Sequence, residues 1–172
     1  MAEHVVITDL GFDPEELRAK YREERDKRLR LDGNDQYFEV TGDFSHYVDD
    51  PYIDAPLARE PLFDDVDVIV VGGGFGGLLT GARLTEAGMG CIRIIEKGGD
   101  FGGTWYWNRY PGAACDVESY IYLPLCEELN FVPKEKYTHA PEILAHSRAI
   151  GEKFNLYDYA CFQTEVEGMC WS

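Results

Sequence analysis

The clearest pattern of apolar positions lies between residues 66 and 96. Residues 66–71 form a nearly continuous run of β-branched side chains, which is typical of a strand buried on both faces of a parallel sheet. Residues 78–88 (LLTGARLTEAG) predict a helix closed by Gly88, and residues 91–96 predict a second strand. The order strand, helix, strand predicts an α/β fold.

Before this region the pattern is charged and aromatic. Asp13 followed by Pro14 and two glutamates is typical of a helix start, with an aspartate cap and acids in the first turn. We expect this helix to run to about Leu31 and to end at Gly33. Residues 36–61, rich in Asp, Pro and aromatic side chains, predict an extended arm without a core of its own. A lid or an element of a substrate cavity is the alternative.

After this region the sequence predicts one more helix and one more strand. Residues 140–154 open with Ala-Pro-Glu and place apolar side chains near one helical face, whereas residues 162–167 alternate polar with apolar or β-branched side chains, as a half-exposed strand does. We therefore divide the chain into an N-terminal helix and arm, residues 1–64, and the first part of an α/β domain, residues 65–172.

A glycine motif joins the first predicted strand to its helix. Gly72, Gly74 and Gly77 fit GxGxxG, in which the first glycine permits a tight turn, the second lets the backbone approach a pyrophosphate and the third allows close helix–strand packing. Glu96, at the end of the second strand, is placed to accept hydrogen bonds from a ribose and disfavours a 2′-phosphate. The motif predicts a site for FAD or NAD rather than NADP; a glycine-rich turn that binds nothing is the alternative.

The loop predicted over residues 98–116 has an unusual composition. It combines two tryptophans, two tyrosines and an arginine with glycines. Aromatic side chains beside a nucleotide site suggest walls for a flat ring system. A hydrophobic loop that merely covers the core is the alternative.

Charge and composition exclude several classes of partner. The 172 residues carry 16 basic and 32 acidic side chains, a net charge of −16, and 45% are hydrophobic. Such a charge disfavours nucleic acid and anionic membranes as partners. The five cysteines lack CxxC spacing, so we expect neither a disulfide framework nor a metal site. The first ten residues do not resemble a signal peptide, and no apolar run approaches the roughly 20 residues of a membrane span. We expect a cytoplasmic protein.

The run GGTWYWNRYPGAACD over residues 102–116, with the following Glu-Ser pair, resembles class B flavoprotein monooxygenases, and among them the Baeyer–Villiger monooxygenases. This resemblance covers roughly residues 65–170. It implies a Rossmann-like FAD-binding domain of the flavoprotein type that has two dinucleotide-binding domains. It also implies an NADPH-using enzyme that inserts one oxygen atom from O₂ beside a ketone carbonyl to give an ester or lactone.

The resemblance also implies roles for individual residues. Some would contact FAD, others would meet the NADP(H) cofactor, and one carboxylate would pair with a catalytic arginine; a loop-capping role is the alternative for that carboxylate. The residues implied to contact FAD are Gly72, Gly74, Phe75, Gly76 and Gly77 at the pyrophosphate, Glu96 at the adenosine ribose, Gly103, Thr104, Trp105, Tyr106 and Trp107 along the cofactor, Asp116 and Tyr122 near the flavin, and Val166 at the adenine end. The residues implied to meet NADP(H) are Ala114, Cys115 and Asp116. Asp116 is also the catalytic candidate.

The chain departs from the family pattern at several points. Gly76 stands where Ser or Ala is frequent, and residues 123–125 read Leu-Pro-Leu where Cys-Tyr-Ser is common. A second glycine fingerprint, the family's downstream fingerprint and the catalytic arginine are absent from these residues. We therefore expect an incomplete enzyme that needs the remainder of the molecule, from a continuing or a second chain. The alternatives are an N- or S-oxygenating enzyme and a non-catalytic FAD-binding fragment.

Overall fold

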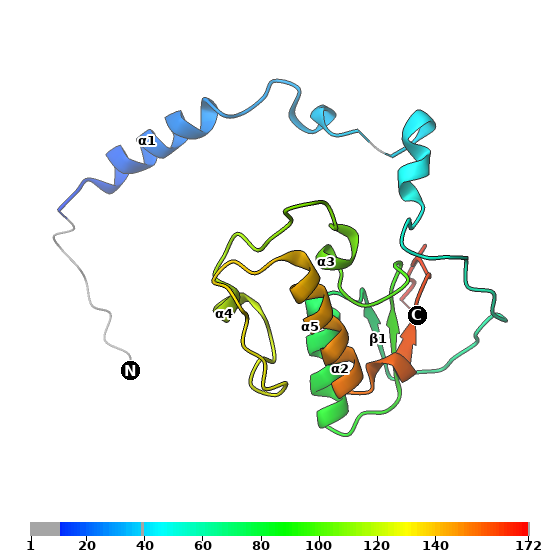
Figure 1. Cartoon of the computed structure of the whole chain (residues 1–172). Coiled ribbons are helices and arrows are strands. Elements are labelled where there is room, and N and C mark those ends of the chain that lie inside the picture. The colour runs from blue at the N-terminus through cyan, green and yellow to red at the C-terminus, as the bar shows by residue number, and fades with distance from the viewer. Residues whose placement is uncertain (1–10, 39, 172) are drawn as a thin grey trace. The chain divides into compact units, whose positions relative to one another are not determined.

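The computed structural model describes residues 11–38 and 40–171, which divide into two compact units, Met1–Asp49 and Asp50–Ser172. The N-terminal unit holds helix α1 (Pro14–Asp26) and the 3₁₀ turns η1 (Gly33–Gln36) and η2 (Gly42–Val48), none of which has a buried residue (Figure 1). The predicted absence of a signal peptide concerns residues 1–10, which lie outside the described part of the chain.

Helix α1 begins as predicted but ends early. The side chain of Asp13 accepts a hydrogen bond from the Glu15 amide at 2.8 Å and caps the helix. The predicted end at about Leu31 was wrong, because the helix stops at Asp26. Leu29 and Leu31 are exposed, so no tertiary packing extends the helix beyond its ion-paired, solvated turns.

The second unit contains a parallel sheet in the order β1-β2-β3, which confirms the α/β fold. Its strands are β1 (Val68–Val71), β2 (Ile92–Ile95) and β3 (Ala160–Cys161). In the register, Val70 lies opposite Ile94, and Ile94 lies opposite Ala160. Strand β2 therefore stands in the middle, and β1 is an edge strand among the described residues.

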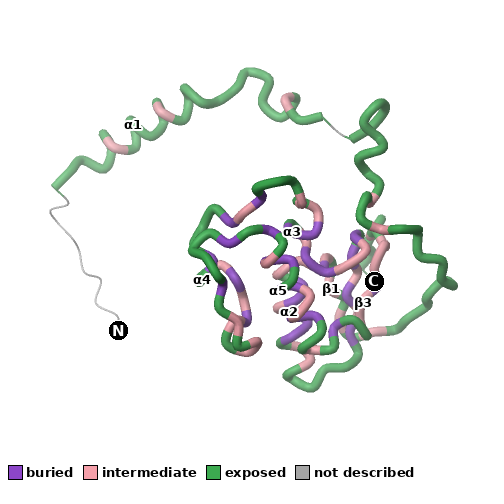
Figure 2. The backbone as a smooth tube through the Cα atoms, viewed as in Figure 1, coloured by how far each residue is buried: buried purple, intermediate pink, exposed green. Residues whose placement is uncertain are grey.

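Helices α2 (Phe75–Glu86) and α5 (Ala140–Lys153) lie side by side against one face of the sheet (Figure 1). Both helices agree with the predicted positions to within a few residues. Each of these two helices and β2 carries buried residues (Figure 2). The cluster at the centre of this layer consists of Leu78, Ala82, Ile94, Phe101, Leu125, Ile150 and Leu156.

The prediction that the first strand is buried on both faces was wrong for this chain. In β1 the burial alternates, and Ile69 and Val71 are 57% and 56% exposed. The physical reason is that α2 and α5 cover a single face, so every second side chain of the edge strand meets solvent.

Two further expectations need correction. The loop predicted over 98–116 contains a helical turn, α3 (Thr104–Trp107), and the strand predicted over 162–167 does not form. Gln163 adopts a left-handed conformation with φ of 50°, which breaks the extended geometry just after β3. Short elements α4 (Ser119–Tyr122) and η3 (Leu156–Tyr159) complete the second unit.

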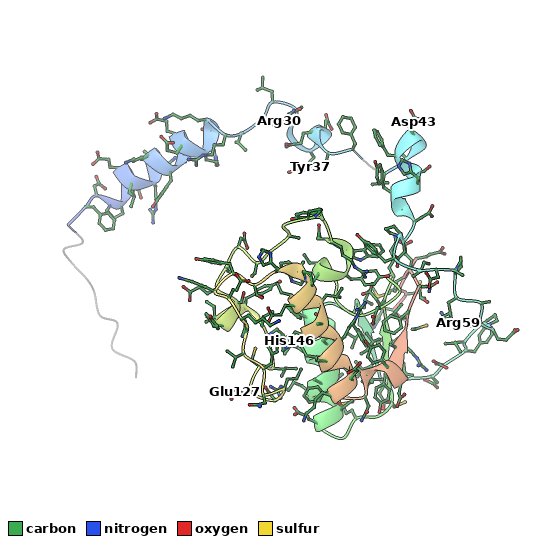
Figure 3. All side chains as sticks on the ribbon, viewed as in Figure 1. Arg30, Tyr37, Asp43, Arg59, Glu127 and His146 are labelled. Atoms are coloured by element: carbon green, nitrogen blue, oxygen red, sulfur yellow. The ribbon has the colours of Figure 1, made fainter. Side chains whose placement is uncertain are left out.

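A buried histidine fixes the segment that follows α4. His146 of α5 is 2% exposed, and its Nε2 lies 2.6 Å from the carbonyl oxygen of Pro124 (Figure 3). The Phe131 ring stacks on the imidazole with 4.4 Å between ring centroids. Burial lowers the pKa of His146 below its ordinary value, so the neutral imidazole is the favoured form.

The second unit begins at Asp50, earlier than residue 65, where the sequence placed the start of the α/β domain. Residues 50–64 have no regular secondary structure beyond turns. Within the described ranges, no helix has both the length and the apolar character needed to cross a bilayer.

Candidate functional site

The glycine loop forms the tight turn that the motif requires. Gly72 has φ of +99°, and its amide donates a hydrogen bond to the Ile95 carbonyl at 2.7 Å. A Cβ atom on Gly77 would lie 1.9 Å from the Gly72 carbonyl oxygen. A side chain at Gly77 would therefore push α2 away from β1, which gives this glycine the packing role that its position predicts.

The N-terminus of α2 is open for an anion. Gly74 is its N-cap, without a side-chain cap, and the first turn holds no acidic residue. The hydrogen bond from the Leu78 amide to the Gly74 carbonyl, 2.9 Å long, is of the helical i to i−4 kind. The amides that precede Leu78 belong to the helix start, where N–H groups lack such partners and the helix dipole is positive. This arrangement suits a pyrophosphate.

Glu96 connects the glycine loop to the loop after β2. Its side chain is buried at 6% exposure; Oε2 accepts from the Gly73 amide at 2.5 Å and Oε1 accepts from the Gly98 amide at 2.6 Å. An ionised carboxylate offers about four acceptor positions. Two amides therefore leave acceptor positions for ribose hydroxyls, which fits the nucleotide that the sequence predicts.

The second glycine loop packs directly on the first. The Gly102 amide donates to the Gly73 carbonyl at 3.0 Å. Gly103 has φ of +53°, and a Cβ atom there would lie 2.7 Å from Gly74 Cα. The two loops that the sequence assigned to a cofactor are thus in backbone contact, although they lie about thirty residues apart along the chain.

The aromatic residues of the second loop divide between core and surface. Trp105 and Tyr106 are buried, Thr104 is exposed and Trp107 is partly buried. The Trp105 indole donates from Nε1 to the Tyr122 hydroxyl at 3.0 Å. Tyr122 also meets the Phe75 ring edge to face at 5.5 Å, so this aromatic group stands at the start of α2. Part of the loop therefore covers the core, and its role as a wall for a flat ring stays a prediction.

The residues after this loop are held against the start of α5. Ala114 forms an antiparallel bridge with His139, and the Cys115 amide donates to the Thr138 carbonyl at 2.9 Å. Cys115 is buried, whereas Asp116 is exposed. The described residues give Asp116 no hydrogen bond or ion pair, so its side chain does not act as a loop cap in this structure.

The two residues before Val166 contact the end of β2. The Thr164 amide donates to the Glu96 carbonyl at 3.0 Å, and Lys97 forms an ion pair with Glu165 at 2.9 Å. These contacts bring the half-buried Val166 to the carboxyl end of β2, where an adenosine moiety would lie.

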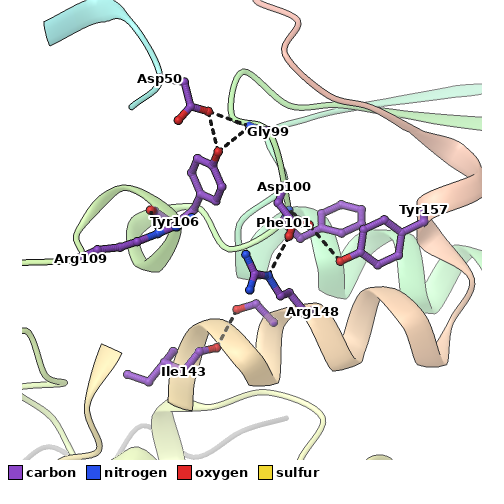
Figure 4. Close-up of polar contacts among 10 residues, drawn as sticks. Asp50, Gly99, Asp100, Phe101, Tyr106, Arg109, Ile143, Arg148 and Tyr157 are labelled. Atoms are coloured by element: carbon purple, nitrogen blue, oxygen red, sulfur yellow. Dashed lines mark hydrogen bonds and ion pairs between the residues drawn. The ribbon is translucent and has the colours of Figure 1, made fainter. Parts of the chain in front are cut away.

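Sequence reasoning missed the acidic and aromatic residues that precede the sheet. Asp50 accepts hydrogen bonds at Oδ2 from the Tyr106 hydroxyl at 2.6 Å and from the Gly99 amide at 2.9 Å (Figure 4). Burial and the bond to Asp50 raise the pKa of Tyr106 to about 12, which keeps its hydroxyl protonated as a donor. The Arg109 guanidinium carbon lies 3.8 Å from the Tyr52 ring centroid. The aromatic-acid composition of residues 36–61 was the available signal, but it does not indicate which loop they contact.

The described residues contain no group of three His, Cys, Asp or Glu side chains that could hold a metal ion. All five cysteines are free thiols. The candidate site consists of the two glycine loops, Glu96 and the aromatic group at the start of α2.

Comparison with known proteins shows what this chain is similar to. The family described as NAD(P)-binding Rossmann-like domain matches residues 70–131. The chain is 52% identical over 165 residues to Baeyer-Villiger monooxygenase ATR8 of Stachybotrys chlorohalonatus, covering 95% of this chain and 26% of that protein. It spans about a quarter of the length of the curated relatives it matches, which include neopentalenolactone D synthase of Streptomyces avermitilis at 54% identity and a Baeyer-Villiger monooxygenase of Streptomyces coelicolor at 50% identity.

Two solved structures are similar in fold and in sequence. The polycyclic ketone monooxygenase from Thermothelomyces thermophila matches with a TM-score of 0.73 and 43% identity, over 87% of this chain and 25% of that one. OTEMO in complex with FAD and NADP matches with a TM-score of 0.56 and 33% identity, over 60% of this chain and 20% of that one. The Rossmann-like domain predicted from the sequence is thereby confirmed.

Proposed function

We propose that this chain, which belongs by sequence to the Baeyer–Villiger monooxygenases, forms the FAD-binding part of an NADPH-using enzyme that converts ketones to esters or lactones. One observation carries the proposal. The glycine loop, the second glycine loop and the Glu96 carboxylate meet at one end of the sheet, with Gly74 and Gly103 in backbone contact. The relatives' names and the OTEMO complex with FAD and NADP support the cofactors.

The residues present divide the work of holding FAD. Amides at the start of α2, in Phe75, Gly76 and Gly77, would bind the pyrophosphate. Glu96 would accept from the adenosine ribose, and Val166 would contact the adenine end. The residues that would line the rest of the cofactor are Gly72, Gly74, Gly103, Thr104, Trp105, Tyr106, Trp107 and Tyr122.

When bound, FAD would accept a hydride from NADPH and, once reduced, activate O₂ for oxygen insertion. This chain would orient the cofactor and exclude water with the aromatic group at α2. Ala114 and Cys115 would meet the nicotinamide cofactor. Asp116, exposed and without a partner among the described residues, is free to pair with a catalytic arginine supplied by the remainder of the enzyme, and it would fix the position and charge of that arginine.

The proposal also covers partners and location. Small ketones and O₂ are the substrates, and the remainder of the enzyme supplies the NADPH domain. Five free thiols suit a reducing compartment, so we place the protein in the cytoplasm.

The test is a product assay on the complete protein with FAD and NADPH. A panel of cyclic and linear ketones should give esters or lactones in step with NADPH consumption. If amines or sulfides are oxygenated and no ketone is, the enzyme is an N- or S-oxygenating one instead. Tight FAD binding without any oxygenated product would reduce the chain to a cofactor-binding module.

A further inference from the structure

The segment of residues 50–59 contacts both the second glycine loop and the residues just before Val166. It precedes the sheet by several residues and has no regular secondary structure beyond turns. Four of its residues nevertheless make specific polar contacts with residues about fifty to one hundred positions further along the chain. These residues are Asp50, Tyr52, Leu57 and Arg59.

Asp50 holds the beginning of the second glycine loop. Its Oδ2 accepts from the Gly99 amide and the Tyr106 hydroxyl, and the Gly99 amide also reaches the Tyr106 hydroxyl at 3.0 Å (Figure 4). Its Oδ1 accepts from the Tyr52 amide at 2.9 Å, which fixes the carboxylate in a local turn. Because Glu96 binds the neighbouring Gly98 amide, two carboxylates from distant parts of the chain hold two successive amides of this loop.

Tyr106 transmits this contact to the rest of the loop. A Cβ atom on Gly98 would lie 2.8 Å from the Tyr106 ring, and one on Gly99 would lie 2.4 Å from Ile53 Cγ2. The Tyr106 ring therefore packs closely on the backbone of Gly98, and Ile53 packs on the backbone of Gly99. Because Tyr106 belongs to α3, its contacts with Asp50 and Gly99 connect the start of the loop to the helical turn that follows Gly103.

Tyr52 holds the end of the same loop. Its hydroxyl donates to the Trp107 carbonyl at 3.2 Å, and the Arg109 guanidinium carbon lies 3.8 and 4.5 Å from the ring centroids of Tyr52 and Tyr106, which meet each other edge to face. Each of these two cation–π contacts is favourable by roughly 0.5–1 kcal/mol at exposed sites.

The later part of the segment holds the residues just before Val166. The Leu57 amide donates to the Gln163 side chain at 2.7 Å, and Arg59 donates to the Thr164 hydroxyl at 2.6 Å. Thr164 in turn donates its amide to the Glu96 carbonyl, two residues before Val166.

We propose that Asp50 is a positioning residue for the cofactor site: through Gly99 and Tyr106 it holds residues 98–109 against the glycine loop in the form that receives FAD. This inference rests on the proposed FAD function. Asp50 itself does not touch the cofactor. It acts on the backbone of the loop. Residues 50–59 are therefore part of the cofactor site and more than a linker.

The experiment compares Asp50→Ala with Asp54→Ala in the complete protein. Asp54 is an exposed neighbour whose carboxylate forms no hydrogen bond or ion pair with the described residues. The first readout, amide hydrogen exchange in the cofactor-free protein, needs no FAD. Asp50→Ala should speed exchange of residues 98–109 by at least about tenfold and leave α2 unchanged. The second readout is the dissociation constant of FAD, which should rise at least about tenfold in Asp50→Ala and stay unchanged in Asp54→Ala.

Tyr106→Phe provides the coupling test, because it keeps the ring and removes the hydroxyl. Alone it should weaken FAD binding, and added to Asp50→Ala it should change the dissociation constant by less than about twofold. Unchanged exchange in 98–109, unchanged FAD affinity in Asp50→Ala, or independent effects of the two substitutions would each overturn the inference. If the wild-type protein fails to bind FAD while the exchange difference is present, the fault lies in the proposed function and the positioning of the loop by Asp50 stands.

Discussion

Gly74 and Gly103 touch through their backbones: a Cβ atom on Gly103 would lie 2.7 Å from Gly74 Cα, and a Cβ atom on Gly74 would lie 3.4 Å from Gly103 Cα. This contact is possible because neither residue carries a side chain. It joins the two glycine loops at the N-terminus of α2, and it makes both glycines part of one site.

Gly74→Val should abolish FAD binding. Its side chain would occupy the place where the backbone approaches a pyrophosphate and would also press on Gly103. We expect the affinity for FAD to fall by at least about a hundredfold, equal to about 2.7 kcal/mol, and the purified protein to be colourless. The matched control is Gly90→Ala, an exposed glycine outside the two loops where a Cβ atom meets only the Tyr159 hydroxyl, at 3.8 Å. A Gly74→Val protein with full flavin occupancy would show that this loop is not the cofactor site.

Glu96→Gln should weaken both the fold and the cofactor site. In the wild-type protein, two backbone N–H groups donate to the Glu96 carboxylate. The side-chain NH₂ group of glutamine would face one of these N–H groups and cannot accept from it, so one of the two charge-assisted hydrogen bonds is lost. We expect the free energy of unfolding to fall by about 2 kcal/mol, measured by urea denaturation. Glu165→Gln, at an exposed ion pair with Lys97, should cost less than about 0.5 kcal/mol. Equal losses in the two variants would contradict the role of Glu96.

The sequence predicted the parts of the site that depend on local geometry. A run of β-branched residues, GxGxxG and a helical pattern specify a turn that needs positive φ at Gly72, and the structure has it. The same local patterns predicted a helix directly after this turn, observed at residues 75–86, and an acidic residue, Glu96, at the end of the second strand. Local patterns carry this information because the backbone geometry of a turn or a helix depends mainly on residues that are close in sequence.

The parts that depend on distant contacts could not be predicted in this way. Nothing near Asp50 indicates that its carboxylate meets Tyr106, 56 residues later. The expected strand at 162–167 fails at Gln163, whose left-handed φ is set by contacts of its side chain and amide with Leu57 and Gly98. The exposure of Ile69 depends on which face the helices cover, and periodicity alone does not report it.

Asp116→Ala should leave the fold and FAD binding intact but lower ketone oxygenation. The side chain is exposed and has no partner among the described residues, so its removal should change the free energy of unfolding by less than about 0.5 kcal/mol. If Asp116 positions the catalytic arginine, turnover should fall by at least about tenfold, equal to about 1.4 kcal/mol. Steady-state kinetics with product analysis measure this effect, and unchanged turnover would remove Asp116 from the catalytic machinery.

His146 should make stability depend on pH. Burial lowers its pKa in the folded protein from the ordinary value of 6.5, so between the lowered value and 6.5 the unfolded chain binds more protons. Stability is therefore fully present above about pH 6.5 and falls with decreasing pH, by up to about 1.4 kcal/mol per unit. Urea denaturation at about pH 7.5 and about pH 5.5 should show a smaller pH dependence in His146→Gln than in His139→Gln, a change at an exposed histidine. Identical pH dependence in both variants would exclude His146 as the source.

The flavin content of the complete purified protein tests the central claim most directly. The protein should be yellow, and flavin released by denaturation should be FAD, in a ratio of one molecule per chain, with Gly74→Val as the empty control. A wild-type protein that holds no FAD after incubation with a saturating concentration, while its circular dichroism shows a folded α/β domain, would contradict the account.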